Sequence, residues 1–310
     1  MKINKPKFWD QKDSFFYYIL YPLSLFFLIS VYLKKKITKP LKFKIPLICI
    51  GNIYLGGTGK TPTSILIANE LKMMGKRPAI IRKFYKSHKD EHELIKANFK
   101  GLILSKRRNL AIYTAEKNNY DIAVLDDGFQ DYSIKKKLNI ICFNSNQLIG
   151  NGSVFPSGPL RDSLNSLQNA QIVLINGKRK KDFEEKILKI NQNLKIFYSY
   201  YKPLNIEEFK NKKLLAIAGI ANPDNFFKLI EENNINIKER MIFPDHYEFS
   251  LNEVQNIIEK AESKNLQIIM TEKDYFKIHH FKFEQLKYLK TSLEIEKKNE
   301  FLKLIRESYV

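Results

Sequence analysis

Cysteine is nearly absent from this chain of 310 residues, which contains only Cys49 and Cys142. Both lie inside apolar runs with the composition of buried strands. Two such residues make neither a disulfide framework nor a cysteine metal site, and this usage is typical of a reducing cytosol. Internal repeats and low-complexity tracts are also lacking, and the apolar fraction of 44% is ordinary. We therefore expect a folded globular protein with room for two domains.

Acidic side chains are scarce, because 33 Asp and Glu stand against 53 Lys and Arg, for a formal net charge of +20. Such an excess invites a nucleic-acid partner. However, lysine supplies 45 of the basic residues, scattered along the chain, and no recognisable nucleic-acid module accompanies them. Anionic lipid headgroups would use the same charge, at about 1 kcal/mol per well-placed basic residue. We expect no nucleic-acid partner and favour a membrane surface.

One long stretch lacks charge altogether. Residues 14–33 form twenty uncharged, largely apolar positions, followed by Lys34, Lys35 and Lys36. Such a stretch is long enough to cross about 30 Å of hydrocarbon, and the basic flank favours a cytoplasmic location for the downstream chain. Pro22 leaves room for a kinked or interfacial helix, and a buried core helix is the alternative. We assign residues 1–44 to a membrane-associated helix with its basic flank.

A glycine-rich segment follows the apolar run 45–52. The strict G-x-x-x-x-G-K-[ST] pattern would have glycine where this chain has Tyr54, but Gly56, Gly57 and Gly59 still allow close backbone approach to a polyphosphate. A helical pattern begins at once and stops at Gly75, so its positive end points at the same phosphates. An ordinary strand-to-helix loop is the alternative. We predict a nucleotide-binding loop made of Tyr54, Leu55, Gly56, Gly57, Thr58, Gly59, Lys60 and Thr61.

Beyond this loop the chain alternates strand-like and helix-like segments. Strands are predicted at residues 78–82, 122–125, 139–143, 171–176, 214–218 and 267–270. The alternation indicates an α/β fold with parallel sheets and ligands at the carboxyl ends of the strands. A basic stretch at 178–189, followed by an aromatic run at 197–201, suggests a connector. We predict a P-loop NTPase-like parallel sheet domain over residues 45–200 and a second, smaller α/β domain over 201–310.

The predicted strand at 122–125 ends in Asp126 and Asp127, 66 residues after Lys60. An aspartate at the end of a neighbouring strand commonly completes the Mg²⁺ shell in a nucleotide-binding sheet. Two adjacent carboxylates also need a cation, or one of them would stay protonated. A turn made by the Asp-Gly pair is the alternative. We assign Mg²⁺ to Thr61, Asp126 and Asp127.

Several longer motifs carry a family resemblance. In order and spacing, GNIYLGGTGKTP, DDGFQ, GNGSVFPSGPLRDSL, AGIANPDNFF, FPDHYEF and TEKDYFKI resemble tetraacyldisaccharide 4′-kinase, the lipid A 4′-kinase of Gram-negative bacteria. The matches run from about residue 45 to residue 278, and a membrane-associated N-terminal helix is also typical of that family. The blocks are long and unusual, so their joint signal is strong.

The resemblance implies a kinase with two α/β/α domains. It would transfer the γ-phosphate of ATP, with Mg²⁺, to the 4′-hydroxyl of a tetraacyldisaccharide 1-phosphate at the cytoplasmic face of the inner membrane. We expect a monomer. Carried over residue by residue, the resemblance implies a phosphate-binding lysine, an acceptor base with its assisting histidine, and polar residues that line the site; these are Lys60, Asp90 and His246, then Glu91, Arg108, Gln130 and Arg161.

The chain departs from the family pattern in three places. The Ser-Arg-Gly-Tyr turn after the second strand lacks glycine and carries Lys83. The loop up to Asp90 is shorter than usual, and Asp131 replaces the histidine that usually ends Asp-Asp-Gly-Phe-Gln-His. His88 and His92 bracket Asp90 and could be read as a metal pair, but the H-E-x-x-H pattern is not met. Judged from the residues alone, His246 is an ordinary hydrogen-bonded histidine.

Two rival functions stay open. A GGTGKT loop also suits a membrane-associated regulatory ATPase, which hydrolyses ATP without a lipid acceptor and switches a partner-binding surface. A lipid-binding protein that has lost catalysis is the third possibility, motivated by the changes at Lys83 and Asp131. A phosphoryl-transfer assay with and without the lipid acceptor separates the three.

Overall fold

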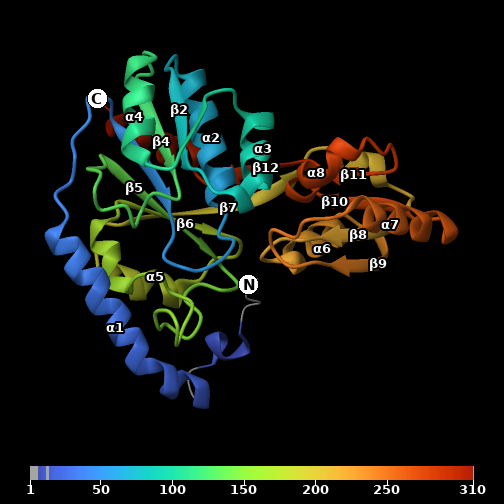
Figure 1. Ribbon diagram of the computed structural model, residues 1–310, viewed down its shortest axis with the longest axis horizontal. Coiled ribbons are helices and arrows are strands. Elements are labelled where there is room, and N and C mark those ends of the chain that lie inside the picture. Colours follow the sequence, from blue (N-terminus) through green and yellow to red (C-terminus); the bar gives the residue numbers. More distant parts are fainter. Residues whose placement is uncertain (1–5, 12–13, 310) are drawn as a thin grey trace.

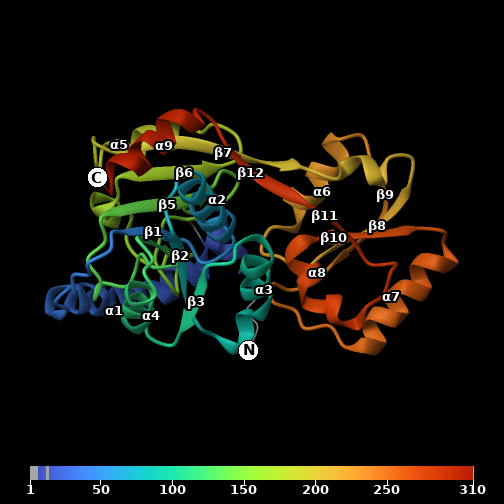
Figure 2. The same ribbon diagram turned by 90° about the horizontal axis from the view of Figure 1, so that it is seen from above.

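The structure is a computed structural model that describes residues 6–11 and 14–309. Its strands form two sheets that lie side by side (Figures 1 and 2). The larger sheet has the strand order β12-β7-β6-β5-β1-β4-β2-β3, and its neighbours run parallel except for the β12–β7 pair. The smaller sheet has the order β11-β10-β8-β9 and is parallel. The predicted α/β class, with a large parallel sheet and a smaller second α/β unit, is confirmed.

All six predicted strands are present. The strands are β1 (Leu47–Gly51), β2 (Pro78–Lys83), β3 (Leu102–Ser105), β4 (Ile122–Asp126), β5 (Leu138–Asn144), β6 (Ile172–Asn176), β7 (Lys195–Pro203), β8 (Lys213–Ala218), β9 (Asn236–Ile242), β10 (Gln267–Thr271), β11 (Lys287–Leu289) and β12 (Thr291–Ile295). The α-helices are α1 (Phe15–Ile37), α2 (Lys60–Met73), α3 (Lys89–Asn98), α4 (Arg108–Lys117), α5 (Lys181–Leu188), α6 (Pro223–Glu232), α7 (Leu251–Ser263), α8 (Glu272–Ile278) and α9 (Lys298–Glu307). Short 3-10 helices include η2 (Lys86–His88).

The central strands are buried on both faces. In β1, Ile48 and Ile50 point to one side and Leu47 and Cys49 to the other, because successive side chains of a strand alternate. The first pair packs with residues of α2, α3 and α9, and the second with residues of α4 and α5. Each fully buried aliphatic side chain contributes about 1.5–3 kcal/mol. This double cover makes the larger sheet a rigid support for residues at its strand ends.

The chain leaves the larger sheet and later returns to it. Residues 197–201, expected within a connector, form part of β7, and β7 and β12 together extend toward the smaller sheet (Figure 2). After the smaller sheet, β12 pairs with β7, and Phe301 of α9 packs against Phe197 with ring centroids 5.3 Å apart. The predicted boundary at residue 201 assigns β12 and α9 to the smaller unit, whereas both lie against the larger sheet. The domain limits stay a prediction.

Helix α1 lies along the outside of the larger unit (Figure 1). Only 6% of the most apolar 18-residue stretch of this helix is buried. Its buried residue Ser24 donates a hydrogen bond of 2.9 Å to the Val154 carbonyl and accepts one of 2.9 Å from the Ser157 N–H. Near its end, Lys35 pairs with Asp162 at 2.9 Å. The helix is therefore docked along its length and exposes most of its apolar side chains.

Candidate active site

The glycine-rich loop follows the carboxyl end of β1 and leads directly into α2. Gly59 caps this helix with φ +88°, a left-handed conformation that favours glycine, and a Cβ there would lie 3.1 Å from Nδ2 of Asn176. The Nδ2 of Asn52 donates to Thr58 Oγ1 at 3.1 Å and so braces the loop from inside. The Tyr54 side chain is fully buried in the core, which leaves only its backbone for a ligand.

The two aspartates at the end of β4 have separate surroundings. Asp126 is fully buried, and its carboxylate accepts hydrogen bonds from Thr61 Oγ1 at 3.2 Å and from Ser64 Oγ at 3.0 Å. Asp127 has φ +55°, and its carboxylate lies 3.0 Å from Arg161 Nη1 and 3.8 Å from Lys60 Nζ. Burial alone would raise the pKa of the Asp127 carboxyl, but Lys60 and Arg161 outweigh burial and hold this pKa well below its usual range.

Oxygen donors at this end of the sheet fit a magnesium ion. Thr61 supplies a hydroxyl and Asp126 a carboxylate, both hard oxygen ligands of the kind that Mg²⁺ prefers. Among the described residues, no group of three or more His, Cys, Asp and Glu side chains could hold a metal by itself. Mg²⁺ characteristically takes one or two protein ligands and completes its shell with phosphate oxygens and water. A shared site with a nucleotide therefore fits this donor set.

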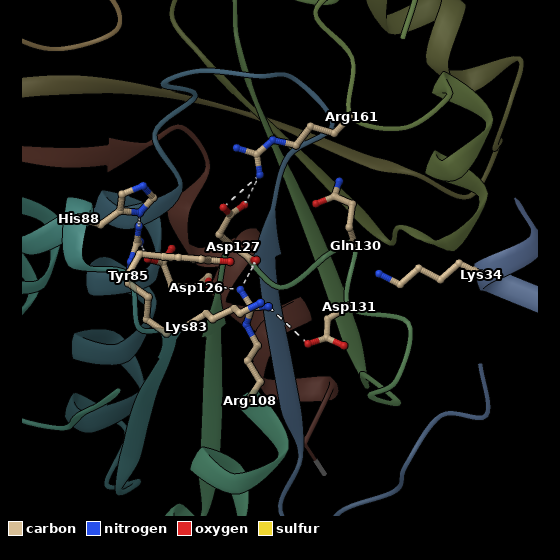
Figure 3. A pocket seen from close by; sticks show the side chains of 11 residues that line it. Lys34, Lys83, Tyr85, His88, Arg108, Asp126, Asp127, Gln130, Asp131 and Arg161 are labelled. Carbon is tan, nitrogen blue, oxygen red and sulfur yellow. Dashed lines mark hydrogen bonds and ion pairs between the residues drawn. The ribbon is translucent and has the colours of Figure 1, made fainter. Parts of the chain in front are cut away.

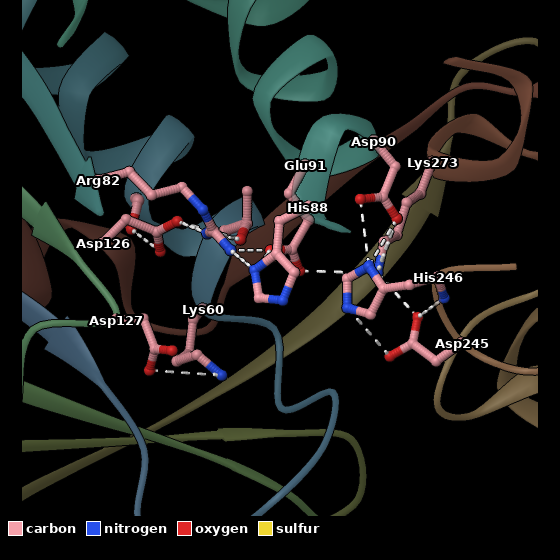
Figure 4. A network of polar contacts seen from close by, with 12 residues as sticks. Lys60, Arg82, His88, Asp90, Glu91, Asp126, Asp127, Asp245, His246 and Lys273 are labelled. Carbon is pink, nitrogen blue, oxygen red and sulfur yellow. Dashed lines mark hydrogen bonds and ion pairs between the residues drawn. The ribbon is translucent and has the colours of Figure 1, made fainter. Parts of the chain in front are cut away.

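A second cluster lies beside this one, on the other side of Arg82 and His88 (Figure 4). Asp90, in the first turn of α3, is buried, and its carboxylate oxygens lie 3.0 and 3.1 Å from Nδ1 of His246. His246 follows β9 in the smaller unit and has φ +57°, an uncommon conformation for a non-glycine residue. Lys273 and Lys277 of α8 lie 3.4 and 3.9 Å from the same carboxylate. The cluster thus joins the two units.

Charge neighbours decide the protonation of Asp90. Burial would raise the pKa of its carboxyl, but the hydrogen bond with His246 and the charge of Lys273 outweigh burial and hold this pKa well below its usual range. Asp90 is therefore a carboxylate at neutral pH, as a general base must be.

His88 and Arg82 connect the two clusters. Sequence reasoning gave Arg82 no role and considered His88 only as half of a metal pair. The His88 ring stacks on His246 with centroids 4.5 Å apart and planes 5° apart. Arg82 contacts Thr61, Asp126, Glu91 and His88. His92 instead stacks on Phe84, so the two histidines around Asp90 do not form a metal pair. Lys273 belongs to the motif TEKDYFKI, which the sequence shows, but its contact with Asp90 is visible only in the structure.

Beside these clusters lies a pocket of about 320 Å³, shown in Figure 3. Of the predicted substrate-contacting residues, Arg108, Gln130 and Arg161 line it, whereas Glu91 pairs with Arg82 and Lys273. Asp131, the departure from the family pattern, lies 3.4 Å from Arg108 Nη1 and accepts from Ser133 at 2.6 Å. The pocket is lined by Lys34, Arg82, Lys83, Tyr85, His88, Arg108, Asp126, Asp127, Gln130, Asp131 and Arg161.

Comparison with known proteins identifies the family. A family model described as tetraacyldisaccharide-1-P 4′-kinase matches residues 16–309. The chain belongs to this family. The tetraacyldisaccharide 4′-kinase of Pelagibacter ubique is 40% identical to it over 312 residues, which cover 99% of this chain and 98% of the relative. That of Francisella tularensis subsp. novicida is 32% identical over 89% of this chain and 94% of the relative.

A solved structure supports the fold. The "apo" form of LpxK from Aquifex aeolicus, crystallised in complex with ATP, superimposes with a TM-score of 0.73 over 95% of this chain and 99% of its own. The two sequences are 22% identical, so the likeness establishes the arrangement of the two sheets and leaves residue roles to be argued from the site.

Proposed function

We propose that this chain is a tetraacyldisaccharide 4′-kinase, which transfers the γ-phosphate of ATP to the 4′-hydroxyl of a tetraacyldisaccharide 1-phosphate in lipid A biosynthesis. Family membership supports the reaction, since the relatives carry this name. One observation carries the assignment within the site: Arg82 and His88 link the Asp90–His246 pair to Thr61, next to Lys60 in the glycine-rich loop (Figure 4). An acceptor base beside a phosphate-binding loop supplies the two parts that such a kinase needs.

The residues divide between the two reactants. The N–H groups at the start of α2 and the Lys60 ammonium would bind the β- and γ-phosphates of ATP. Thr61 and Asp126 would hold Mg²⁺, which when bound supplies charge neutralisation on the phosphates. Asp127, the third predicted ligand, pairs with Lys60 and Arg161, and its contact with the metal stays a prediction. Arg161, paired with Asp127, would approach the same phosphates. A loose phosphoryl-transfer transition state depends mainly on such positioning and charge.

Asp90 would act on the acceptor. Its carboxylate would accept the proton of the 4′-hydroxyl as that oxygen bonds to the γ-phosphorus and the bond from this phosphorus to ADP breaks, so that ADP leaves. His246 holds the carboxylate in place through Nδ1. Lys273 lies 3.4 Å from the Asp90 carboxylate and helps to keep it ionised. The same ammonium also pairs with Asp245 at 2.9 Å. Glu91, Arg108 and Gln130 would border the sugar.

We also propose that α1 lies in the cytoplasmic face of the inner membrane rather than across it. Its mid-helix residue Ser24 is hydrogen-bonded to the globular body, while Phe15 and Phe26 are 72% and 71% exposed. A helix docked in this way can bury its outer face at the depth of the headgroups without leaving the body. The lysines at 34–36 would meet the anionic headgroups. That the protein is a monomer stays a prediction.

The test is a reconstituted reaction. Purified protein in detergent is incubated with ATP, Mg²⁺ and the disaccharide 1-monophosphate, and the products are separated by mass. The expected product is the 1,4′-bisphosphate. ATP hydrolysis that proceeds equally without the lipid would instead support the regulatory ATPase. Lipid binding with neither reaction would support the non-catalytic alternative.

A further inference from the structure

Arg82 contacts both ends of the site with one guanidinium. It lies near the carboxyl end of β2, and its side chain is 6% exposed. Its Nη1 contacts the Asp126 carboxylate and lies 3.2 Å from Thr61 Oγ1. Its Nη2 pairs with Glu91 and lies 3.3 Å from Nδ1 of His88 (Figure 4). The planar fork of arginine, with five donors, suits such a bridge, whereas lysine carries a single ammonium.

The first pair of contacts uses the oxygens that are assigned to the metal. Oδ2 of Asp126 and Oγ1 of Thr61 lie 3.2 Å apart, and the same Nη1 atom approaches both. A guanidinium donates along the lone pairs that a cation would coordinate, and two positive charges repel at short range. Arg82 in this position and a divalent cation on the same two oxygens therefore exclude each other.

We propose that Arg82 competes with the divalent cation for Thr61 and Asp126, and that filling of the metal site leaves the guanidinium on Glu91 and His88 alone. The inference rests on the metal site assigned under the proposed function. It makes Arg82 a positioning residue that links the two clusters, because His88 stacks on His246 and His246 contacts Asp90. Metal binding to Thr61 and Asp126 would in this way change the contacts of His88, next to the proposed acceptor base.

A simpler role for Arg82 would be to neutralise the buried Asp126. Both roles predict that removal of Arg82 destabilises the fold, because an unpaired buried carboxylate is costly. Removal of Arg82 takes a positive charge off Asp126 and so favours a cation under both roles. Only competition for the two oxygens predicts that the charge-conserving Arg82→Lys also binds the metal more tightly. Arg108 provides the matched control, since it approaches the same aspartates but through the carbonyl oxygens of Asp126 and Asp127 and through Asp131.

The experiment measures Mn²⁺ binding to the full-length, nucleotide-free protein in detergent by electron paramagnetic resonance. Arg82→Met is expected to bind Mn²⁺ about tenfold more tightly than the wild type, because a cation then meets an uncompensated carboxylate. Arg108→Met is expected to bind as the wild type does. Thermal melting of the same proteins supplies a second readout, in which Mn²⁺ raises the Tm of Arg82→Met more than that of the wild type. Equal or weaker binding by Arg82→Met overturns the competition.

Two further variants keep the result interpretable. Arg82→Lys retains a positive charge but cannot bridge Asp126 and Glu91 together, so about threefold tighter Mn²⁺ binding is expected even if Arg82→Met does not fold; unchanged binding would then overturn the proposal. Asp126→Asn tests the metal site itself. Weaker binding in Asp126→Asn with no gain in the Arg82 variants overturns the competition and leaves the metal site standing. No change in Asp126→Asn overturns both.

Discussion

Nδ1 of His246 lies 3.0 Å from Oδ2 of Asp90, although 156 residues separate the two in the chain. Asp90 belongs to α3 beside the larger sheet, and His246 follows β9 of the smaller one. Lys273 of α8 reinforces the contact by pairing with Asp90, Glu91 and Asp245. The contact between the proposed base and its histidine therefore forms only when the two units are docked. The distance between Asp90 and His246 depends on the relative position of the two units.

We predict that Asp90→Asn lowers kcat by about 10²- to 10⁴-fold, the usual contribution of a general base. The KM for ATP is expected to change little, because an interaction made mainly in the transition state contributes little to ground-state binding. Steady-state kinetics with varied ATP measures both quantities. Asp121→Asn is the matched control, since Asp121 is exposed and its carboxylate accepts from the backbone N–H of Arg77.

The same pair predicts a strongly non-additive double mutant. If Asp90 and His246 act as one unit, His246→Ala adds little to the loss already caused by Asp90→Asn. The measurement is a double-mutant cycle in kcat. Fully additive losses would separate the two residues, and Glu91 or an aspartate of the 126–127 pair would become the better candidate for the base.

A third prediction concerns the glycine-rich loop. Lys60→Ala is expected to lower kcat by at least about 10²–10³-fold, the effect of removing one charged group aimed at the transition state. The protein should stay folded, because Arg161 still pairs with Asp127 at 3.0 Å when Lys60 is removed. Lys72→Ala in the same helix is the control, since Lys72 is exposed. Turnover and circular dichroism are measured together, and near-normal turnover of Lys60→Ala would refute the nucleotide assignment.

Sequence reasoning succeeded where local patterns determine structure. The apolar strand ahead of Gly56 and the helix after Lys60 are both present, and Asp126 ends the neighbouring strand. Parallel strands place their carboxyl ends at one edge, so a meeting of Thr61 and Asp126 can be expected on sequence grounds alone. Their 3.2 Å contact agrees with that reasoning.

The strands that were missed have weaker local signals. β9 alternates between exposed and half-buried residues and carries charged side chains, as in Lys238 and Arg240, because it lies at the edge of the smaller sheet. β12 joins the larger sheet only by antiparallel pairing with β7, some ninety residues earlier in the chain. Neither feature follows from periodicity, since both depend on long-range pairing.

Residue roles that depend on the docking of the two units were equally hidden. Lys273 sits within a recognisable motif, but its contact with Asp90 requires α8 to pack against α3. The spacing of His88 suggests only a metal pair with His92, yet its stacking partner is His246, from the other unit. Spacing along a chain cannot reveal such contacts.

The exposed face of α1 gives a prediction about the membrane. Phe15→Glu and Phe26→Glu are expected to reduce partitioning into vesicles of phosphatidylethanolamine and phosphatidylglycerol, because each buried phenylalanine contributes about 1.5–3 kcal/mol. Nucleotide affinity should be unchanged, since both side chains point away from the body. Vesicle sedimentation and nucleotide titration measure the two effects. Met73→Glu is the control, because Met73 is 70% exposed but belongs to α2. Unchanged partitioning of both α1 variants would place the membrane contact elsewhere.

His88 gives a prediction about pH. Burial, helped by the charges of His246 and Arg82, lowers the pKa of His88 from 6.5 to about 4. The unfolded chain therefore binds one more proton than the folded chain between these values, and stability falls as pH decreases from about 6.5 to about 4. The full shift corresponds to about 3 kcal/mol, which the 30% exposure of the ring reduces to about 1–2 kcal/mol.

We predict that His88→Phe, which keeps an aromatic ring against His246 but cannot titrate, loses about 0.5–1 kcal/mol less stability than the wild type between pH 7 and pH 5, since this window covers about half of the shift. Urea unfolding at the two pH values measures the difference. His280→Phe is the control, because His280 is exposed and should leave the pH dependence as it is in the wild type. Equal losses by His88→Phe and the wild type would contradict the prediction. The imidazole of His88 would then take up its proton as readily in the folded chain as in the unfolded one, and its burial beside Arg82 would not lower its pKa.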